Sequence, residues 1–447
     1  MIGAGMRGAD AYTPHLLAEP GDGAIVGVAE PNPVRRKAFA DRYGVPSEAC
    51  FDDYRPLLAA HLQADYAVVA TPDSEHTVPA HLALEHGLHV LLEKPMATTL
   101  EECEALVAAA ERAGRLLQIC HVLRYAPLYE TVKAVIDSGE LGEVVTIQHS
   151  ENVSHWHYAH SYCRGKWRNR EASSPMILAK SCHDMDLLYW LAGAPPARLT
   201  SIASPTRLTA ANAPPDAPEF CIEGCSHASS CAYDAVATYQ HLSPLLLDLA
   251  LKTRAPGAAG APSPSQPEEA ALPRASGWDS WPVTAITDDT SKLGVEHALR
   301  TTNYGRCVYR IPDADQPASQ HVGLLFSNGV SASFTMHSTS HREGRETRID
   351  GTRGSLVAGF YTLEQFVEVT DHKTGRTRSV DLPIETGIHG GADPRLFRGF
   401  LAAIRGEGAP LTTGAESLWS HRMAFEADRA AREGIVVQWK LEPTPSS

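Results

Sequence analysis

The chain has 447 residues, of which 43% are hydrophobic and 21% charged, and its formal net charge at neutral pH is -14. This composition excludes disorder of the whole chain, and a length of about two to three ordinary domains predicts two domains. The acidic balance argues against a nucleic-acid partner, because binding a polyphosphate requires a surplus of lysine and arginine. A small-molecule substrate fits better.

Hydropathy and cysteine content indicate the compartment. No stretch approaches the roughly 20 apolar residues that a membrane span needs, and the N-terminus lacks the basic-then-apolar pattern of a signal peptide. The nine cysteines are an odd number, and several lie in apparently buried segments, which suits a reducing compartment. We therefore expect a cytoplasmic protein without a membrane partner.

The first 120 residues alternate strand-like and helix-like patterns. Alternation at this spacing predicts crossover connections and a parallel sheet, and hence an α/β Rossmann domain over residues 1–122. The predicted strands span 24–29, 64–70, 89–92 and 116–120, and the predicted helices span 33–43, 78–86 and 100–113.

After about residue 122 the pattern changes to a few helices and long alternating segments. These predict an α+β domain over 123–447 with a large, mainly antiparallel open sheet covered on one face. The predicted helices span 127–138 and 184–191, and the predicted strands include 144–151, 321–326, 330–336 and 347–350. An inserted lobe is expected at about 205–300, and its Ala-, Pro-, Gly- and Ser-rich part at 253–276 is predicted to be a flexible surface loop.

A glycine motif opens the chain. Gly3, Gly5 and Gly8 form a GxGxxG, in which the first glycine makes a tight turn, the second admits a pyrophosphate close to the backbone, and the third allows helix and strand to pack. Only Met1 and Ile2 precede it, whereas a strand usually has about five residues, so we expect the natural start to lie upstream.

A carboxylate at the end of the next strand supports the prediction of a dinucleotide-binding site. Glu30 lies 22 residues after Gly8, close to the spacing at which a carboxylate reaches a ribose 2′-hydroxyl. Because it would repel a 2′-phosphate, NAD is favoured over NADP, although Arg35 and Arg36 keep NADP open. A glycine-rich turn beside an exposed glutamate is the alternative.

Three motifs around the next strands carry a resemblance. The triplet Glu93-Lys94-Pro95 ends a predicted strand, Thr71 to His76 (TPDSEH) precede it, and His121 to Tyr125 (HVLRY) follow it. Together they closely resemble the Gfo/Idh/MocA oxidoreductases, the group of glucose-fructose oxidoreductase and inositol dehydrogenase. The resemblance covers nearly the whole chain and includes the GTRG at 351–354 and the ESL at 416–418.

The resemblance implies an NAD-dependent oxidoreductase that moves hydride to or from a hydroxyl-bearing carbon of a sugar, cyclitol or derivative. It places Lys94 beside the nicotinamide, where a lysine could hydrogen-bond the substrate hydroxyl and ease its proton loss. A salt-bridged lysine at a strand end is the alternative. A homodimer or homotetramer is also implied. The cofactor contacts implied by these motifs are Gly3, Gly5, Met6, Arg7, Gly8, Glu30, Thr71, Pro72, His76, Glu93, Lys94 and Arg124.

A second family signature, Asp-x-x-x-His-x-x-Asp, is matched in part. His183 and Asp186 match, but Ala179 stands where the first aspartate is expected. We predict that His183 is the general acid or base, since an ordinary pKa near 6.5 suits that task, and that Lys180 and Asp186 bind substrate. A core histidine at a helix start is the alternative for His183.

Four cations lie within seven residues upstream of this signature. Arg164, Lys166 and Arg168 are predicted to bind an anionic group on the substrate, with Arg170 beside them, and a solvated charged loop is the alternative. The preceding aromatic run could stack on a sugar ring or simply pack. Its members are His155, Trp156, His157, Tyr158 and His160.

Cysteines form the last cluster. Cys221, Cys225 and Cys231 are spaced 4 and 6 residues apart, and Cys307 is a plausible fourth thiolate, with His227 as a substitute. Four thiolates would make a closed structural zinc site in the inserted lobe, whereas unliganded loop thiols are the alternative.

Three functions fit these motifs. The first is the NAD-dependent dehydrogenase. The second is an NAD-dependent glycosidase of the same family, which oxidises a ring hydroxyl transiently, eliminates the aglycone and returns the hydride. The third is a non-catalytic NAD-binding regulatory protein. The altered position Ala179 and the basic run keep the second function open.

Overall fold

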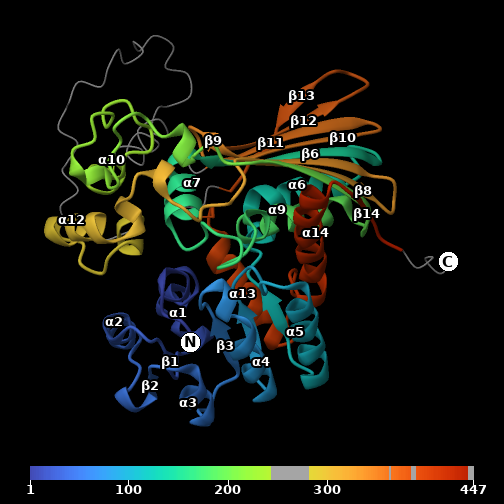
Figure 1. Cartoon of the computed structure of the whole chain (residues 1–447). Helices are drawn as coiled ribbons and strands as arrows, with labels where there is room; N and C mark the ends of the chain where they lie inside the picture. The colour runs from blue at the N-terminus through green and yellow to red at the C-terminus, as the bar shows by residue number, and fades with distance from the viewer. Residues whose placement is uncertain (243–280, 362–363, 384–388, 441–447) are drawn as a thin grey trace.

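The computed structural model describes residues 1–242, 281–361, 364–383 and 389–440. The N-terminal domain lies below a large sheet, with helices between the two, and a lobe projects from one end of the sheet (Figure 1). Within the described residues, no helix combines the length and the apolar character needed to cross a bilayer. The loop predicted at 253–276 lies outside the described residues.

The N-terminal domain has a parallel sheet in which Ile2 takes a central position. β3, β4 and β5 pair in parallel in that order, and β1 pairs in parallel with β2. Ile2 forms parallel bridges to both Ala29 and Val69, and so joins the two parts into one sheet. The strands are β1 (Val28–Ala29), β2 (Cys50–Phe51), β3 (Tyr66–Val69), β4 (His89–Leu92) and β5 (Leu117–Ile119).

Capping residues fix the ends of the helices around this sheet. Asn32 accepts hydrogen bonds from two backbone N–H groups at the start of α2, and Gly44, at a φ of 67°, ends that helix. Thr99 caps the start of α5, and Gly114 ends it in the same left-handed conformation. The helices are α1 (Pro14–Ala18), α2 (Pro33–Tyr43), α3 (Tyr54–Ala59), α4 (Thr77–Glu85) and α5 (Leu100–Ala113), and a π-helical turn at Arg7–Tyr12 precedes α1.

The second domain is built on a nine-stranded sheet with the order β13-β12-β11-β10-β6-β9-β8-β7-β14. Neighbouring strands are antiparallel except for β6 and β9, which run parallel. The predicted fold class is thus confirmed, with this parallel pair inside the sheet. The strands are β6 (Val144–Ser154), β7 (Pro196–Ser204), β8 (Ser319–Phe326), β9 (Ser331–Ser340), β10 (Gly344–Gly351), β11 (Gly354–Tyr361), β12 (Gln365–Asp371), β13 (Thr377–Ser379) and β14 (Val436–Gln438).

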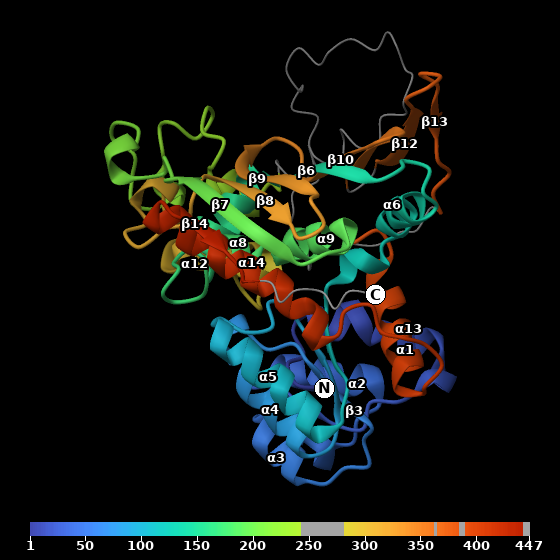
Figure 2. The same ribbon diagram turned by 90° about the vertical axis from the view of Figure 1, so that its right-hand side faces the viewer.

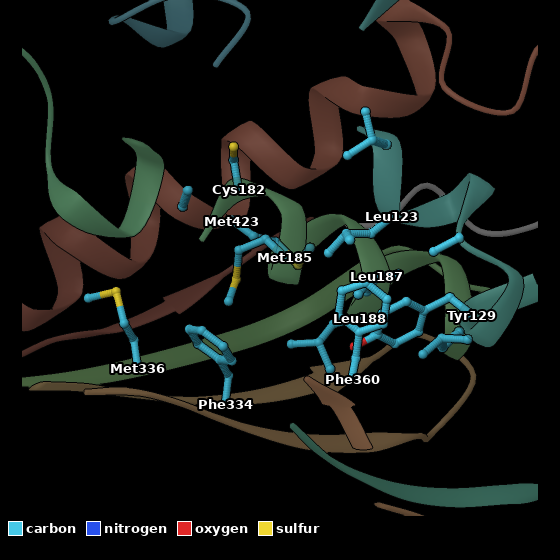
Figure 3. Close-up of a cluster of buried hydrophobic side chains, with 14 of the residues drawn as sticks. Leu123, Tyr129, Cys182, Met185, Leu187, Leu188, Phe334, Met336, Phe360 and Met423 are labelled. Carbon is cyan, nitrogen blue, oxygen red and sulfur yellow. The ribbon is translucent and has the colours of Figure 1, made fainter. Parts of the chain in front are cut away.

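Helices cover one face of this sheet (Figure 2). The side chains of α9 pack between the sheet and α14, and Figure 3 shows Met185 and Leu188 of α9 beside Phe334 and Phe360 of the sheet. Burial of such side chains supplies the main favourable free energy of this domain. The helices are α6 (Pro127–Asp137), α7 (His155–Tyr158), α8 (Met176–Ala179), α9 (Cys182–Ala192), α10 (Ala235–Tyr239), α12 (Lys292–Thr301), α13 (Ala392–Ile404) and α14 (Gly414–Glu433).

The end of the chain returns to the N-terminal domain. α14 packs on α5 as well as on α9. The Ile119 N–H at the end of β5 donates a 2.8 Å hydrogen bond to the Thr412 carbonyl. The residues that follow β4 and β5 are therefore held against the start of α9. This contact surface is where the predicted catalytic residues lie.

The lobe has a small core of its own, formed by α10, α12 and the residues around them. It also reaches the N-terminal domain, because Asp288 accepts hydrogen bonds from Asn32 and Arg35 at 2.9 and 3.0 Å. The lobe therefore stands beside the end of β1.

Candidate functional site

The glycine loop is packed tightly at its two ends and open in its middle. A Cβ on Gly3, which has a φ of +87°, would lie 2.6 Å from the Ala70 carbonyl oxygen, and one on Gly8 would lie 2.2 Å from the Gly3 oxygen. A Cβ on Gly5 would meet no atom within 4 Å. The loop thus needs glycine at its ends for folding, while the open space over Gly5 fits the close approach of a pyrophosphate.

Glu30 is held beside this loop by backbone donors. Its two carboxylate oxygens accept the N–H groups of Ala4 and Asn32 at 2.9 and 3.0 Å, and the residue is 7% exposed. Each oxygen keeps a further lone pair for a ribose hydroxyl. Arg35 forms an ion pair with Asp288, whereas Arg36 donates to the Glu30 backbone carbonyl.

Arg7, within the glycine motif, connects three parts of the chain. Its guanidinium contacts Glu93 at 2.6 Å and Asp393 of α13 at 2.7 Å, and the Tyr12 hydroxyl donates to Glu93 at 2.5 Å. Burial acts to raise the pKa of Glu93, but Arg7 and Tyr12 outweigh it, so this pKa lies below its usual range. The ion pair between Glu93 and Arg7 therefore joins the glycine loop to the end of β4. Met6, the neighbour of Arg7 in sequence, is 45% exposed.

Lys94 reaches across from the N-terminal domain to α8. Its Nζ donates a 2.7 Å hydrogen bond to the carbonyl of Ala179, and the residue is half-buried. The following Lys94–Pro95 peptide bond is cis, and His76 contacts the carbonyls of Pro95 and Thr71 at 2.7 and 2.9 Å. The TPDSEH motif, which includes Pro72, and the EKP motif are thus fixed to each other through His76.

His183 lies next to this contact. It is 6% exposed, its Nδ1 has no hydrogen-bond partner among the described residues, and its ring lies 5.5 Å from that of His121 between centroids. Burial lowers the pKa of His183 well below 6.5, and the positive charge of Lys94 lowers it further. The charge of Lys94 therefore acts on His183, and the imidazole is neutral at neutral pH, as an acceptor of a proton must be.

A further histidine, His389, also lies near His183. The ring of His389 lies 6.2 Å from that of His183, and its Nδ1 contacts Asp393 at 2.9 Å. Asp393 in turn binds Arg7. A carboxylate-oriented histidine thus stands near His183 even though Ala179 removes the expected aspartate. Sequence reasoning missed this pair, because no local spacing relates 389 and 393 to 183.

Arg124 and Asp186 bind each other instead of facing an open site. Two donors of the guanidinium contact the two carboxylate oxygens at 2.7 and 2.8 Å, and the side chains are 2% and 1% exposed. Such a bidentate pair uses the charges of both residues. The structure therefore places Arg124, predicted to contact cofactor, and Asp186, predicted to contact substrate, in a buried link between η5 (Val122–Tyr125) and α9.

Lys180 lies in a buried network of charges below α8. Its Nζ contacts Glu151 at 3.2 Å and Glu343 at 2.9 Å, and Arg345 joins Glu151 to Asp184 at 2.5 and 2.7 Å. Burial acts to lower the pKa of Lys180, but the two carboxylates outweigh it and raise this pKa above its usual range. Lys180 thus keeps its positive charge, and the carboxylates of Glu151 and Glu343 already balance that charge.

Glu343 was not predicted from the sequence, and its side chain is the most exposed in this network. Its side chain is 24% exposed, and its carboxylate also contacts His157 at 2.7 Å and the Ser154 hydroxyl at 2.9 Å. It lies in the turn between β9 and β10, far in sequence from 180, so only the fold brings them together. Its oxygens and the ammonium of Lys180 can bind hydroxyl groups.

The basic run is largely neutralised. Arg168 pairs with Asp313 at 2.9 Å and Arg170 with Asp428 at 2.9 Å, whereas Lys166 is exposed over the ring of Trp167 at 4.3 Å. Arg164 is 2% exposed and donates to backbone carbonyls inside the lobe. This arrangement is closer to a paired charged loop than to a receptor for an anion.

The aromatic run packs inside the protein. Trp156, Tyr158 and His160 are at most 5% exposed, and His160 stacks on Tyr304 with 5.2 Å between ring centroids. His157 faces Glu343 and His155 lies near the Ser340 carbonyl. The structure thus gives these rings partners within the protein.

Two family models match this chain and assign it. One, described as an oxidoreductase family with an NAD-binding Rossmann fold, matches residues 1–121. The other, the C-terminal alpha/beta domain of the same family, matches residues 133–241 and 306–438. The chain belongs to the Gfo/Idh/MocA oxidoreductases. The resemblance stated from the motifs is thereby confirmed, as is an NAD-binding Rossmann domain.

Two curated relatives of this Gfo/Idh/MocA chain are named as dehydrogenases. The chain is 31% identical over 168 residues to 1-carboxy-3-chloro-3,4-dihydroxycyclo hexa-1,5-diene dehydrogenase of Comamonas testosteroni, covering 38% of this chain and 41% of that one. It is 26% identical over 195 residues to inositol 2-dehydrogenase of Salmonella typhimurium, covering 43% and 53%. The chain thus spans about half the length of these curated relatives.

A solved structure extends the likeness in fold to the whole chain. The WlbA dehydrogenase of Bordetella pertussis, in complex with NADH and UDP-GlcNAcA, superposes with a TM-score of 0.63 at 17% identity and covers 99% of this chain and 97% of that one. At this identity the likeness shows the fold that the Gfo/Idh/MocA chain shares with it.

Substitutions at Gly5 and Gly3 should cause different defects, one in NAD binding and the other in stability. Gly5→Ala should fold normally, because nothing lies near the new methyl group, but should weaken NAD binding by filling the open space. Gly3→Ala should lower the free energy of unfolding by about 1–3 kcal/mol, because the backbone is left-handed and the Ala70 carbonyl blocks the methyl group. Calorimetric titration with NAD and urea denaturation measure both. NAD affinity of Gly5→Ala equal to that of the parent would contradict this account of the loop.

The buried ion pair predicts a loss of stability. Asp186→Asn removes the buried carboxylate that binds the guanidinium of Arg124 and leaves it only the exposed Glu416, at 3.7 Å, so it should lower the free energy of unfolding by about 3–5 kcal/mol. The exposed pair of Lys37 and Asp41 offers the matched control, since Asp41→Asn should leave the urea midpoint almost unchanged. Equal effects of the two substitutions would rule out a stabilising part for the Arg124–Asp186 pair.

Proposed function

We propose that this protein is an NAD-dependent dehydrogenase that acts on a hydroxyl-bearing carbon of a sugar or cyclitol. One observation supports the proposal: Lys94, directly after β4, binds the carbonyl of Ala179 just before α9, and the buried imidazole of His183 on the first turn of α9 has its pKa lowered by burial and by the charge of Lys94. The names of the two curated relatives, which include a cyclitol dehydrogenase, support this substrate class.

Lys94 and His183 divide the proton chemistry between them. An ammonium has three N–H donors, so Lys94 can bind the Ala179 carbonyl and still donate to a substrate oxygen, which stabilises the alkoxide that forms. The neutral His183, with a nitrogen free of other bonds, accepts the hydroxyl proton. NAD, when bound, takes the hydride from the same carbon.

His389 can accept the proton from His183 and pass it on towards solvent. Its ring stands between His183 and the carboxylate of Asp393, and it is less buried than His183. The carboxylate that the family usually supplies at position 179 is thus replaced, in this proposal, by Asp393 acting through His389. A water between the two rings would complete the path.

The charges near the end of β1 favour NAD over NADP. In this proposal Glu30, which the Ala4 N–H holds beside the glycine loop, accepts a hydrogen bond from the ribose 2′-hydroxyl, and its charge would repel a 2′-phosphate. Arg35, the cation closest in sequence that could offset this repulsion, is paired with Asp288 of the lobe. We therefore retain NAD as the cofactor.

A neutral substrate fits the surroundings better than an anionic one. Arg168 and Arg170 of the basic run are paired with aspartates, and the buried Arg164 donates to backbone carbonyls inside the lobe, so that among the described residues of this run Lys166 is the exposed cation without an ion pair. Glu343 and Lys180 provide acceptors and donors for hydroxyl groups close to the Lys94 contact. We also retain a homo-oligomer as a prediction, since Ile202 and Val436 are exposed on the sheet.

Replacing Lys94 tests the proposal directly. Lys94→Ala should lower kcat by about 100- to 1,000-fold, because the alkoxide loses its donor, while NAD affinity stays near that of the parent. Lys166→Ala, at an exposed lysine, is the control. The assay screens neutral and acidic sugars and cyclitols for NADH formed. Release of an aglycone without net NADH would identify the glycosidase, and neither signal with any substrate would identify the regulatory protein.

The pH profile tests His183. Because burial and Lys94 lower its pKa, the base form persists below pH 6.5, and kcat/KM should fall only when the pH drops through that lowered pKa. His183→Asn should lower kcat/KM by about 100- to 10,000-fold and remove this acid limb. The exposed His321 provides a control, since His321→Asn should change neither. An acid limb centred at or above pH 6.5 in the parent contradicts the assignment.

A further inference from the structure

Four cysteines meet in the lobe from two distant segments. Cys221, Cys225 and Cys231 lie in the loop before α10, and Cys307 lies beyond α12. All four line one small cavity, together with His227 and Asp234. An antiparallel bridge between Phe220 and Arg306 joins the two segments beside it. The cluster is separate from Lys94 and His183, and the proposed dehydrogenase chemistry makes no use of it.

A buried cation stands at this cavity without a counter-ion. Arg164 is 2% exposed, its Nη2 lies 3.8 Å from the sulfur of Cys221, and its Nη1 has no hydrogen-bond partner in the described part of the chain. Its other contacts are the uncharged carbonyls of Arg306 and Tyr233. Among the described residues no carboxylate forms an ion pair with it, and Asp234 instead caps α10 through the Ala237 N–H.

An unpaired charge in a protein interior is strongly unfavourable, and such groups are normally paired or placed beside a metal site. Thiols are mostly protonated and neutral near pH 7, so free cysteines would leave Arg164 uncompensated. A divalent metal bound by four thiolates carries a net charge of -2 and would supply the missing counter-charge.

We propose that Cys221, Cys225, Cys231 and Cys307 bind one zinc ion as thiolates, with the guanidinium of Arg164 as the buried counter-ion of the site. Each thiol gives its proton to solvent as its sulfur binds the metal, and no electron is transferred. Four sulfur ligands make a closed tetrahedral site, which is the structural kind. The zinc ion fastens the loop before α10 to the segment after α12.

The neighbouring side chains define which groups bind. His227 is occupied, because its Nε2 contacts the Pro215 carbonyl at 2.7 Å, and Asp234 is occupied by its capping bond. As they stand, no three His, Cys, Asp or Glu side chains in the described ranges are spaced to hold a metal ion. Zinc must therefore draw the four sulfurs inward across the cavity, and coordination to the metal makes the thiolates measurably less reactive towards alkylating reagents.

Metal content and thiol protection test the site on the intact chain. Protein purified without chelator should contain one zinc ion per chain, measured by inductively coupled plasma mass spectrometry. Iodoacetamide should then modify the four lobe cysteines only after a strong chelator has removed the zinc, whereas Cys50, a half-buried thiol of the N-terminal domain, should react equally in both states. Cobalt in place of zinc should give intense thiolate-to-metal absorption bands.

Two variants locate the site. Cys307→Ser should abolish stoichiometric zinc, while Cys50→Ser should leave it unchanged. Arg164→Gln keeps all four ligands but removes the counter-charge, and should weaken zinc affinity by about 10- to 100-fold, as loss of an outer-shell partner does. These readouts do not depend on dehydrogenase activity, so their failure leaves the proposed function standing.

Three results would overturn the proposal. A chain that holds no metal and takes up none when zinc is added under reducing conditions excludes the site. Iron with visible absorption in place of zinc excludes zinc as its occupant. Equal alkylation of the lobe cysteines with and without chelator excludes them as ligands even if zinc is present.

Discussion

The site depends on one hydrogen bond between the two domains, from the ammonium of Lys94 to the carbonyl of Ala179. An ammonium at the end of a buried strand needs acceptors, and the carbonyl supplies one while leaving other donors free. The contact fixes how the end of β4 meets the start of α9. His183, on the first turn of α9, is thereby brought within electrostatic reach of Lys94, so the geometry of the site follows from how the domains are joined.

Charge balance decides which polar residues remain available for binding. Arg124 and Asp186 neutralise each other, and Lys180 is neutralised by Glu151 and Glu343. Buried charges are tolerated only when paired, so a cation next to an active site is not by itself a ligand. By the same argument, Arg164 stands out because it has no such partner among the described residues.

Local signals predicted much of the fold. The ends of α2 and α5 agreed with prediction because caps at Asn32 and Thr99 and left-handed glycines fix them. The strand predicted at 24–29 shortened to two residues, and the parallel pairing of β6 with β9 was missed, since pairing depends on how distant segments meet. For the site, the glycine loop and Lys94 were readable from motifs, whereas Glu343 and His389 were not.

A ternary crystal structure with NAD and an unreactive substrate analogue measures the central claim most directly. The account predicts that one analogue hydroxyl lies within about 3.2 Å of both Lys94 Nζ and a ring nitrogen of His183, next to the nicotinamide carbon that carries hydride. A bound analogue whose nearest hydroxyl contacts neither side chain, with the nicotinamide facing elsewhere, would contradict it.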